Sequence, residues 1–321
     1  MILVTGATGF LGSELVRQLI RQGKSVRAIK RQDSIIPEIL KNEQNIDWQT
    51  ADILDYFVLK EAFQDVNEVY HCAAFISFNA GDKKKMLNVN VGGTANIVNL
   101  CLENNIKKLV HVSSIAAVGE GKAGELITEK DHWEFNSRQS GYSISKYESE
   151  MEVFRAVAEG LNAVVINPSI IIGKNAGKEG SGQLFETVRK GLKYYPGGSC
   201  GLVDVEDVAK IMIALMESNI TAERFLINAE NWTYQDLFTE VAQQFNLKPP
   251  SIALKVWMLK LAYFGSRLAS SITGKNYGLT KDTVRSAFKR HNYASDKIKK
   301  AIDIQFKPIK KTIAEICADL G

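Results

Sequence analysis

A glycine-rich segment near the start of the chain constrains its fold most strongly. It spans residues 6–12 with the spacing G-x-x-G-x-x-G, and it follows the apolar run Ile2-Leu3-Val4. Apolar residues then recur at helical spacing, at Leu11, Leu15 and Leu19, so the glycines stand between an expected strand and an expected helix. Glycine tolerates positive φ and lets the backbone approach a pyrophosphate, and the N-terminus of the helix offers N–H donors to its oxygens. This placement predicts a dinucleotide-binding turn, although the spacing differs from the common G-x-G-x-x-G fingerprint.

Short β-branched runs alternate with helical patterns over the first two thirds of the chain. Alternation of this kind predicts a mainly parallel sheet with helices on both faces, and right-handed crossovers make it a doubly wound α/β fold. We expect strands at residues 2–4, 26–29, 47–50, 68–72, 109–113 and 163–167, and helices at residues 11–20, 59–63, 87–102 and 142–158.

The last third of the chain is dominated by helical patterns, which we expect at residues 237–245, 256–268, 284–289 and 309–320. This change predicts a smaller, mostly helical domain that packs beside the sheet. We therefore assign residues 1–170 and 202–229 to a Rossmann domain that binds the dinucleotide. Residues 171–201 and 230–321 are assigned to a substrate-binding cap domain.

Composition and charge argue against several classes of partner. The 40 basic and 36 acidic residues leave a net charge of +4, which is too small an excess to indicate nucleic acid. The four histidines show no metal-ligand spacing, so no metal site is expected. The four cysteines form no C-x-x-C pair, which is typical of reduced thiols. No basic leader precedes the first strand, and we expect a cytoplasmic protein.

One apolar stretch, residues 252–272, is long enough to raise the question of a membrane span. Lys255, Lys260 and Arg267 interrupt it, and charges there are too costly for an ordinary spanning helix. We therefore expect no stable membrane insertion. The stretch fits a core or cap helix, with a membrane-surface helix as the lesser alternative.

The end of the second expected strand bears on the choice of dinucleotide. A site for NAD usually places an acidic residue there, which binds the ribose 2′-OH. Here the strand runs into Lys30 and Arg31, and the first acid is Asp33. Two cations suit a 2′-phosphate, so NADP(H) is favoured over NAD(H), unless both residues are ordinary surface cations.

A tyrosine and a lysine open the helix expected at residues 142–158. Tyr142 and Lys146 are four residues apart and therefore share a helix face. An ammonium near a phenol stabilises the phenolate and lowers its pKa, which suits a proton donor or acceptor near neutral pH. Ser114 ends an apolar strand at the carboxyl edge of the sheet, where such folds bind ligands, and its hydroxyl can hold a substrate carbonyl. Together the three predict a site for hydride transfer.

These features resemble the extended short-chain dehydrogenase/reductase family, of the NAD-dependent epimerase/dehydratase type. Its members include nucleotide-sugar epimerases, dihydroflavonol reductases and 3β-hydroxysteroid dehydrogenases. The matching segments follow the family's order through the expected sheet domain. They are residues 5–12, 51–53, 71–74, 90–96, 112–119, 142–146, 167–169 and 202–209.

The resemblance implies roles for the matching residues. Tyr142 would be the general acid and base, and Lys146 would tune it and hold the nicotinamide ribose. Ser114 aligns with the family's active-site hydroxyl better than Ser113 does. The residues expected to bind the cofactor, besides Lys146, are Gly6, Thr8, Gly9, Phe10, Leu11, Gly12, Lys30, Arg31, Asp52, Ile53, Ala73, Ala74 and Pro168.

The same Ser-Tyr-Lys chemistry serves reductases and epimerases, and two segments favour a reductase. Residues 26–31 and 203–209 resemble the dihydroflavonol-reductase-like branch. In nucleotide-sugar members an arginine that binds the diphosphate commonly precedes the second segment, whereas Cys200-Gly201-Leu202 stands here. Lys190 or Lys193 can substitute for it. A nucleotide-sugar epimerase or dehydratase with tightly bound NAD is therefore the alternative.

The substrate expected from these features is a small molecule with a ketone, aldehyde or alcohol group. A cofactor-bound sensor without catalysis is a third hypothesis, which the intact Ser114, Tyr142 and Lys146 disfavour. Family members often dimerise through two helices of the sheet domain. Here residues 82–105 and 142–159 are long and partly apolar, which permits a homodimer.

Overall fold

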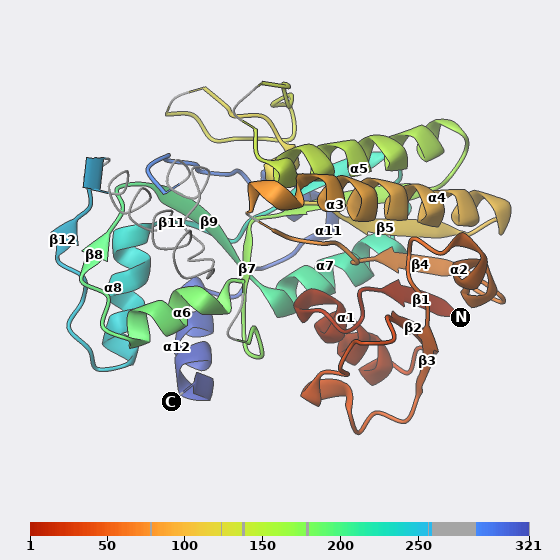
Figure 1. Ribbon diagram of the computed structural model, residues 1–321, viewed down its shortest axis with the longest axis horizontal. Helices are drawn as coiled ribbons and strands as arrows, with labels where there is room; N and C mark the ends of the chain where they lie inside the picture. Colours follow the sequence, from red (N-terminus) through yellow and green to blue (C-terminus); the bar gives the residue numbers. More distant parts are fainter. Residues whose placement is uncertain are drawn as a thin grey trace.

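The computed structural model describes residues 1–77, 79–122, 124–136, 139–177, 180–255, 257–258 and 287–320. A seven-stranded parallel sheet lies at its centre, in the order β10-β6-β5-β4-β1-β2-β3 (Figure 1). Its strands are β1 (Ile2–Thr5), β2 (Val26–Lys30), β3 (Ile46–Thr50), β4 (Glu68–His71), β5 (Lys108–Val112), β6 (Ala163–Pro168) and β10 (Glu223–Ile227). The chain winds outward from β1 to β3, returns to β4 on the other side of β1 and continues to β10, which confirms the doubly wound fold.

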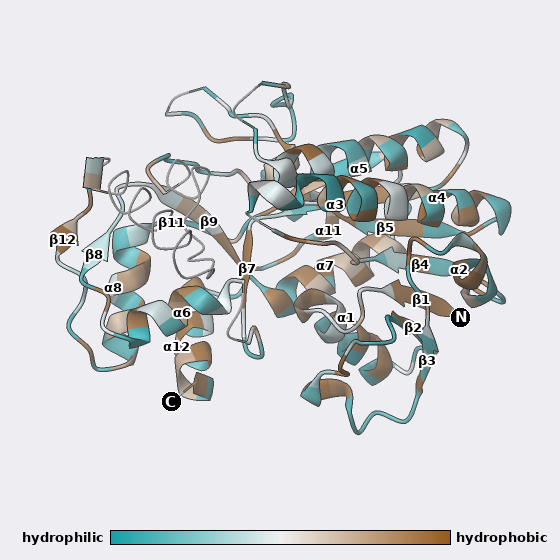
Figure 2. Cartoon of the chain, in the orientation of Figure 1, coloured by the Kyte–Doolittle hydropathy of each residue, from teal (hydrophilic) through white to brown (hydrophobic). Residues whose placement is uncertain are grey.

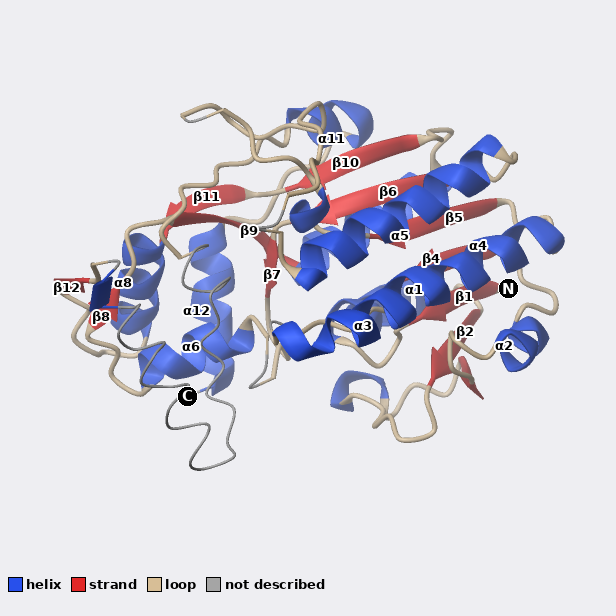
Figure 3. Cartoon of the chain, turned by 45° about the horizontal axis from the view of Figure 1, so that its top comes forward, coloured by secondary structure: helices blue, strands red, loops and turns tan. Residues whose placement is uncertain are grey.

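Helices cover both faces of this sheet (Figures 1 and 3). On one face lie α1 (Phe10–Arg21) and α7 (Val205–Glu217), and on the other lie α4 (Gly93–Glu103) and α5 (Gly141–Ala158). The helix expected at residues 87–102 is divided, because α3 (Lys83–Met86) passes into a π-helical segment, Leu87–Gly92, before α4 begins. The shorter elements of this part are η1 (Glu38–Leu40), α2 (Tyr56–Ala62) and η4 (Ile115–Ala117).

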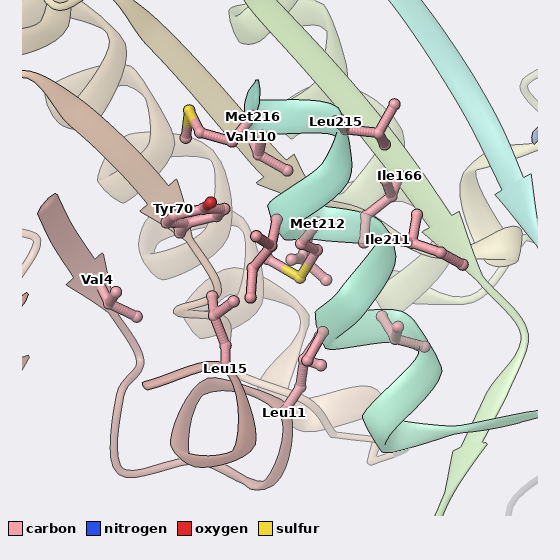
Figure 4. Packing of buried hydrophobic residues seen from close by; sticks show 14 of the residues in the cluster. Val4, Leu11, Leu15, Tyr70, Val110, Ile166, Ile211, Met212, Leu215 and Met216 are labelled. Atoms are coloured by element: carbon pink, nitrogen blue, oxygen red, sulfur yellow. The ribbon is translucent and has the colours of Figure 1, made fainter. Parts of the chain in front are cut away.

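Apolar side chains fill the space between the sheet and the pair α1 and α7 (Figure 4). Val4 and Val110 of the strands meet Leu15 of α1 and Met212 of α7 there, and all four side chains are fully buried. A second apolar cluster lies under α4 and α5. Because both faces are covered, β5 is buried along its whole length. The covering helices α4 and α5 carry hydrophobic and hydrophilic residues in turn (Figure 2).

A second, smaller group of elements packs beside the sheet (Figure 1). Helices α6 (Gly182–Arg189), α8 (Tyr234–Gln244) and α12 (Ile309–Leu320) surround one apolar cluster there, so the helical C-terminal region is confirmed. The sequence analysis missed a three-stranded sheet in this group, in the order β11-β9-β7. Its strands are β7 (Ile170–Ile172), β9 (Ser199–Asp204) and β11 (Glu230–Thr233). These strands are short, and their partners come from distant parts of the chain.

The apolar stretch at residues 252–272 begins with a strand rather than a helix. β12 (Ile252–Ala253) pairs with β8 (Tyr194–Tyr195). The rest of this stretch and most of the helices expected at residues 256–268 and 284–289 lie outside the described residues. Among the helices that the structure does describe, none is long and apolar enough to cross a membrane. The last helix before α12 is α11 (Asp296–Ile302), which packs against β10 and α7.

Leu15 offers a test of the packing beneath the sheet. Leu15→Ala should lower the free energy of unfolding by about 2–5 kcal/mol, because the lost methyl groups leave a cavity between α1, α7 and the strands. Ile35→Ala is the control, because the Ile35 side chain is 84% exposed, and it should change that free energy by less than about 0.5 kcal/mol. Urea denaturation followed by circular dichroism measures both. Equal midpoints for the two variants would contradict this account of the core.

Candidate active site

The glycine loop lies where the strand order of the sheet reverses. β1 and β4 are neighbours, and the chain moves away from them in opposite directions, which opens a crevice at their carboxyl ends. Gly6 has a φ of +66°, and a Cβ atom on it would lie 2.6 Å from the backbone nitrogen of Ala73, just beyond β4. The left-handed conformation and the close approach both require glycine.

The first turn of α1 completes a cradle of backbone atoms. Gly9 is the N-cap residue, and no side chain caps the first amide groups of this helix. Those groups and the positive end of the helix dipole point at the crevice. A Cβ atom on Gly12 would lie 2.1 Å from the carbonyl oxygen of Gly6, so loop and helix touch through backbone alone. The three glycines leave space that larger side chains would occupy, and this space fits the pyrophosphate of a dinucleotide.

The side chains of the loop divide between the core and the crevice. Leu11 is buried in the cluster beneath the sheet, where it anchors α1. Thr8 and Phe10 are half-buried, and the Phe10 ring lies next to Gly173, the residue after β7. Thr8 and Phe10 are therefore the loop side chains that can border a ligand.

Two basic residues end β2, as the sequence indicates. Lys30 is the last residue of the strand and is half-buried. The Arg31 side chain is 62% exposed, and its Nε lies 3.6 Å from a carboxylate oxygen of Asp33. After β3, the Asp52 carboxylate is exposed and accepts a hydrogen bond from the backbone of Leu54, whereas Ile53 is buried. Parallel strands place these residues at the same edge as the glycine loop.

Ala73, Ala74 and Pro168 occupy the other half of this edge. Ala73 and Ala74 follow β4, and Pro168 is the last residue of β6. The backbone nitrogen of Ala73 donates to the Thr5 hydroxyl at 3.3 Å, which ties the end of β4 to the end of β1. Every residue expected to contact a dinucleotide thus lies along one carboxyl edge, apart from Leu11 and Ile53, whose side chains face the core.

Ser114 and Tyr142 meet beyond the end of β5. Ser114 follows this strand and caps η4, because its hydroxyl accepts a hydrogen bond from the backbone nitrogen of Ala116 at 3.1 Å. Tyr142 stands in the first turn of α5. The next residue, Ser143, donates to the carbonyl oxygen of Ala116 at 2.7 Å, which fixes the start of α5 on the Ser114 turn. The side chains of Tyr142 and Ser114 are hydrogen-bonded to each other.

The electrostatics of this pair differ from the sequence expectation. Burial raises the pKa of Tyr142, and the hydrogen bond with Ser114 opposes that shift. Lys146 does not lower the phenol pKa as expected; its ammonium instead donates to the carbonyl oxygen of Val112 at 2.9 Å. Lys146 is only 4% exposed, and burial lowers its pKa to about 8. The structure therefore holds a protonated tyrosine beside a lysine whose charge is costly to keep.

Sequence reasoning missed three polar residues around this pair: Asn90, Asn167 and Glu150. Asn90 lies in the π-helical segment, where its amide donates to the backbone oxygen of Phe75 and to the Ser145 hydroxyl, both at 3.0 Å. It therefore joins the loop after β4 to α5. Asn90 and Asn167 are each the first residue of a segment that matches the family's sequence pattern, residues 90–96 and 167–169, and this match could have identified them. Glu150 follows Lys146 at helical spacing, a signal that could have identified it.

In the described part of the chain, no group of three or more histidine, cysteine, aspartate or glutamate side chains could hold a metal ion. All four cysteines are free, and Cys72, which follows β4, is the one that is not fully buried.

Comparison with known proteins places the chain among dinucleotide-dependent enzymes. The family described as "NAD dependent epimerase/dehydratase family" matches residues 2–227. A putative dihydroflavonol 4-reductase from Synechocystis sp. is 28% identical over 97% of this chain and 92% of its own length. A cinnamoyl-CoA reductase 1 from Petunia hybrida is 27% identical over 76% of this chain and 77% of its own length.

Among solved structures, the chain shares its fold with a UDP-glucose 4-epimerase from Thermotoga maritima. The TM-score is 0.82, and the match covers 99% of this chain and 98% of the epimerase. The two sequences are 20% identical, so this likeness concerns the fold.

Gly12 allows a direct test of the cradle. Gly12→Ala should weaken the binding of NADPH and NADH alike by about tenfold or more, because its Cβ would displace the carbonyl of Gly6 and with it the loop. Gly197→Ala is the matched control, since its Cβ would meet nothing within 4 Å. Nicotinamide fluorescence measures both affinities. An unchanged affinity in Gly12→Ala, with the control also unchanged, would show that the cofactor does not use this loop.

Proposed function

The chain belongs to the NAD-dependent epimerase/dehydratase family, and we propose that it is an NADP(H)-dependent oxidoreductase that acts on a ketone, aldehyde or alcohol substrate. The family and the named relatives make it an NAD(P)-dependent oxidoreductase of the extended short-chain dehydrogenase/reductase type. One observation carries the finer proposal. The hydroxyls of Ser114 and Tyr142 meet beside a buried lysine, at the same sheet edge as the glycine cradle.

In this proposal Ser114 and Tyr142 act on the oxygen of the substrate. The carbonyl oxygen accepts hydrogen bonds from both hydroxyls, and Tyr142 then gives its proton to that oxygen. When bound, the reduced nicotinamide supplies the hydride. Burial raises the pKa of Tyr142, so the phenol keeps its proton until the substrate oxygen gains negative charge. Lys146, on the next turn of α5, holds the nicotinamide ribose in this proposal, while its ammonium also donates to the carbonyl oxygen of Val112.

We assign the two groups of elements different tasks. Residues 1–170 and 202–229 hold the dinucleotide, with the pyrophosphate on the cradle of Gly6, Gly9 and Gly12 and the ribose near Lys146. Residues 171–201 and 230–321 form the cap that selects the substrate. A homodimer through α4 and α5 belongs to the same proposal, since Met151 of α5 is 39% exposed on the outer side of the molecule.

Lys30 and Arg31 support NADP(H) as the cofactor. The Arg31 guanidinium is mostly exposed, and its pair with Asp33 is at the surface, where an ion pair contributes at most about 1 kcal/mol. A 2′-phosphate offers a guanidinium two oxygens at once and makes a stronger contact. Arg31 can therefore leave Asp33 for the phosphate at little cost.

A nucleotide-sugar epimerase with tightly bound NAD is the second candidate, and the shared fold with a UDP-glucose 4-epimerase favours it. Against it stands the sequence of β9, because nucleotide-sugar members of the family commonly carry an arginine just before the segment that matches residues 203–209. Cys200 and Leu202 lie there instead, and both are buried in the apolar cluster of the cap. Lys190 and Lys193 are exposed cations that follow α6. A reductase needs a site for the pyrophosphate of its cofactor but none for a diphosphate on its substrate. The apolar side chains of β9 therefore favour the first candidate.

Tyr142→Phe tests the catalytic assignment. The variant should bind NADPH within about twofold of the wild type and lose turnover by about 10²–10⁴-fold, because only the proton donor is removed. Turnover is measured as NADPH oxidation with a panel of ketones and aldehydes. Tyr147→Phe is the matched control on the same helix, because its ring keeps the stack on Trp133, with centroids 4.2 Å apart. If Tyr142→Phe turned over a substrate as fast as the control, the assignment would be wrong.

Cofactor preference is tested by titration with NADPH and NADH, followed by nicotinamide fluorescence. NADPH should bind about tenfold more tightly, because an ionic hydrogen bond contributes about 1.5–3 kcal/mol. Arg31→Asp should abolish that preference, whereas Arg21→Asp, at the far end of α1, should keep it. Tighter binding of NADH, or NAD retained through purification, would overturn the NADP proposal and place the epimerase first.

A further inference from the structure

Glu150 is a buried acid for which the proposed mechanism has no role. Its side chain is 0% exposed, although it lies on a helix that has solvent on its outer side. It follows Lys146 by one turn of α5 and Tyr142 by two, so all three residues share one face of the helix. A carboxylate in the interior is costly unless other groups compensate its charge.

Two partners hold the Glu150 carboxylate. The amide of Asn167, at the end of β6, donates to one oxygen, and it also donates to the backbone oxygen of Ser114 at 2.9 Å. The guanidinium of Arg224, on β10, lies 3.5 Å from the other oxygen. Arg224 is itself fixed, because it donates to the backbone oxygen of Glu129 at 2.8 Å. Glu150 therefore links α5 to Arg224 of β10 and, through Asn167, to the backbone of Ser114.

The surroundings of Lys146 explain why a carboxylate is needed there. Cys72 and His71, at the end of β4, and His111, on β5, interact electrostatically with Lys146. Burial lowers the pKa of His71 to about 3 and holds that of His111 well below its usual value, so both rings are neutral near pH 7. Burial raises the pKa of Cys72 to about 12, so it is a neutral thiol. Among these described neighbours, Glu150 is the one carboxylic acid, and the electrostatic effect of its charge is to raise the pKa of Lys146.

We propose, resting on the function proposed above, that Glu150 is a positioning residue whose carboxylate is the counter-charge that keeps Lys146 protonated at the catalytic site. Arg224 and Asn167 hold this carboxylate in its ionised form. The Val112 carbonyl aims the ammonium, and Glu150 supplies the negative charge that the carbonyl lacks. Tyr142, Lys146 and Glu150 then form one row of functional side chains on the same face of α5.

The sign of the coupling follows from the charges. The Glu150 carboxylate raises the pKa of Lys146, whereas burial lowers it. By reciprocity, the Lys146 ammonium lowers the pKa of Glu150. Burial raises the pKa of Glu150, and Arg224, Asn167 and Ser113 oppose that shift. Removal of the Glu150 charge should therefore make Lys146 lose its proton at a lower pH.

The experiment follows the titration of Lys146 itself. Nitrogen NMR of protein labelled at the lysine side-chain nitrogens reports its protonation, and Lys146→Met identifies its signal. In Glu150→Gln the midpoint should fall by about one pH unit or more. The glutamine keeps an oxygen that accepts from Asn167, so the change removes charge and retains shape. Glu148→Gln is the matched control, because Glu148 is exposed on the same helix, and it should leave the midpoint unchanged.

An unchanged Lys146 midpoint in folded Glu150→Gln would overturn the proposal, as would an equal fall in Glu148→Gln. If Glu150→Gln does not fold, Lys146→Met tests the same coupling from the other side. Carbon NMR of the Glu150 carboxyl should then show a raised pKa, and an unchanged pKa would overturn the proposal equally. Neither measurement needs a substrate. Failure of the catalytic assignment in Tyr142→Phe is therefore distinguishable from failure of this inference.

Discussion

The parallel pairing of β1 with β4 is the contact on which the rest of the site depends. Thr5 lies opposite His71 in this pair, and the chain continues from β1 into α1 and from β4 toward α3. The crevice between them exists because the chain leaves the two strands in opposite directions. Backbone alone fits at its mouth, where Gly6 and Ala73 touch. Any side chain at Gly6 would push the two strand ends apart.

Helix α5 spans the polar and the apolar parts of the interior. Its first turns lie at the carboxyl edge and carry Tyr142, Lys146 and Glu150, whereas Val153 and Ala156 further along pack into the apolar cluster under the sheet. Burial of each ionised group costs several kcal/mol before its partners compensate. At the carboxyl edge this cost is reduced, because the carbonyl of Val112 accepts a hydrogen bond from Lys146 and Asn167 donates one to Glu150. An apolar α5 would pack as well and would hold no proton donor.

The residues that we propose to be catalytic do not by themselves select a substrate. Relatives named as reductases are similar to this chain in sequence, and a structural neighbour named as an epimerase shares its fold. What distinguishes one substrate from another must come from the walls of the crevice. In this chain β7 follows β6 after Ser169 and pairs with β9 of the smaller sheet. The cap is therefore attached next to Pro168, close to the position of the reacting groups.

Much of this molecule could be predicted from local patterns in the sequence. The glycine spacing, the strand and helix periods and the Tyr-Lys spacing each depend on neighbours within a few turns, so six strands of the Rossmann sheet and helices α1, α5 and α12 were predicted close to their observed bounds. The seventh strand of the sheet, β10, was not predicted. The π-helical segment Leu87–Gly92, within the helix expected at residues 87–102, and the small cap sheet escaped prediction. Both depend on partners that are distant along the chain.

The sequence by itself determined that a dinucleotide cradle and a tyrosine–lysine pair would face one sheet edge, because parallel strands bring their carboxyl ends together. Only the tertiary structure decided the charge states there. Burial raises the pKa of Tyr142, a carbonyl of β5 engages Lys146, and Arg224 of β10 reaches Glu150. Spacing along a helix shows which residues share a face. The pKa of each group depends on what packs against that face, and those groups come from other strands.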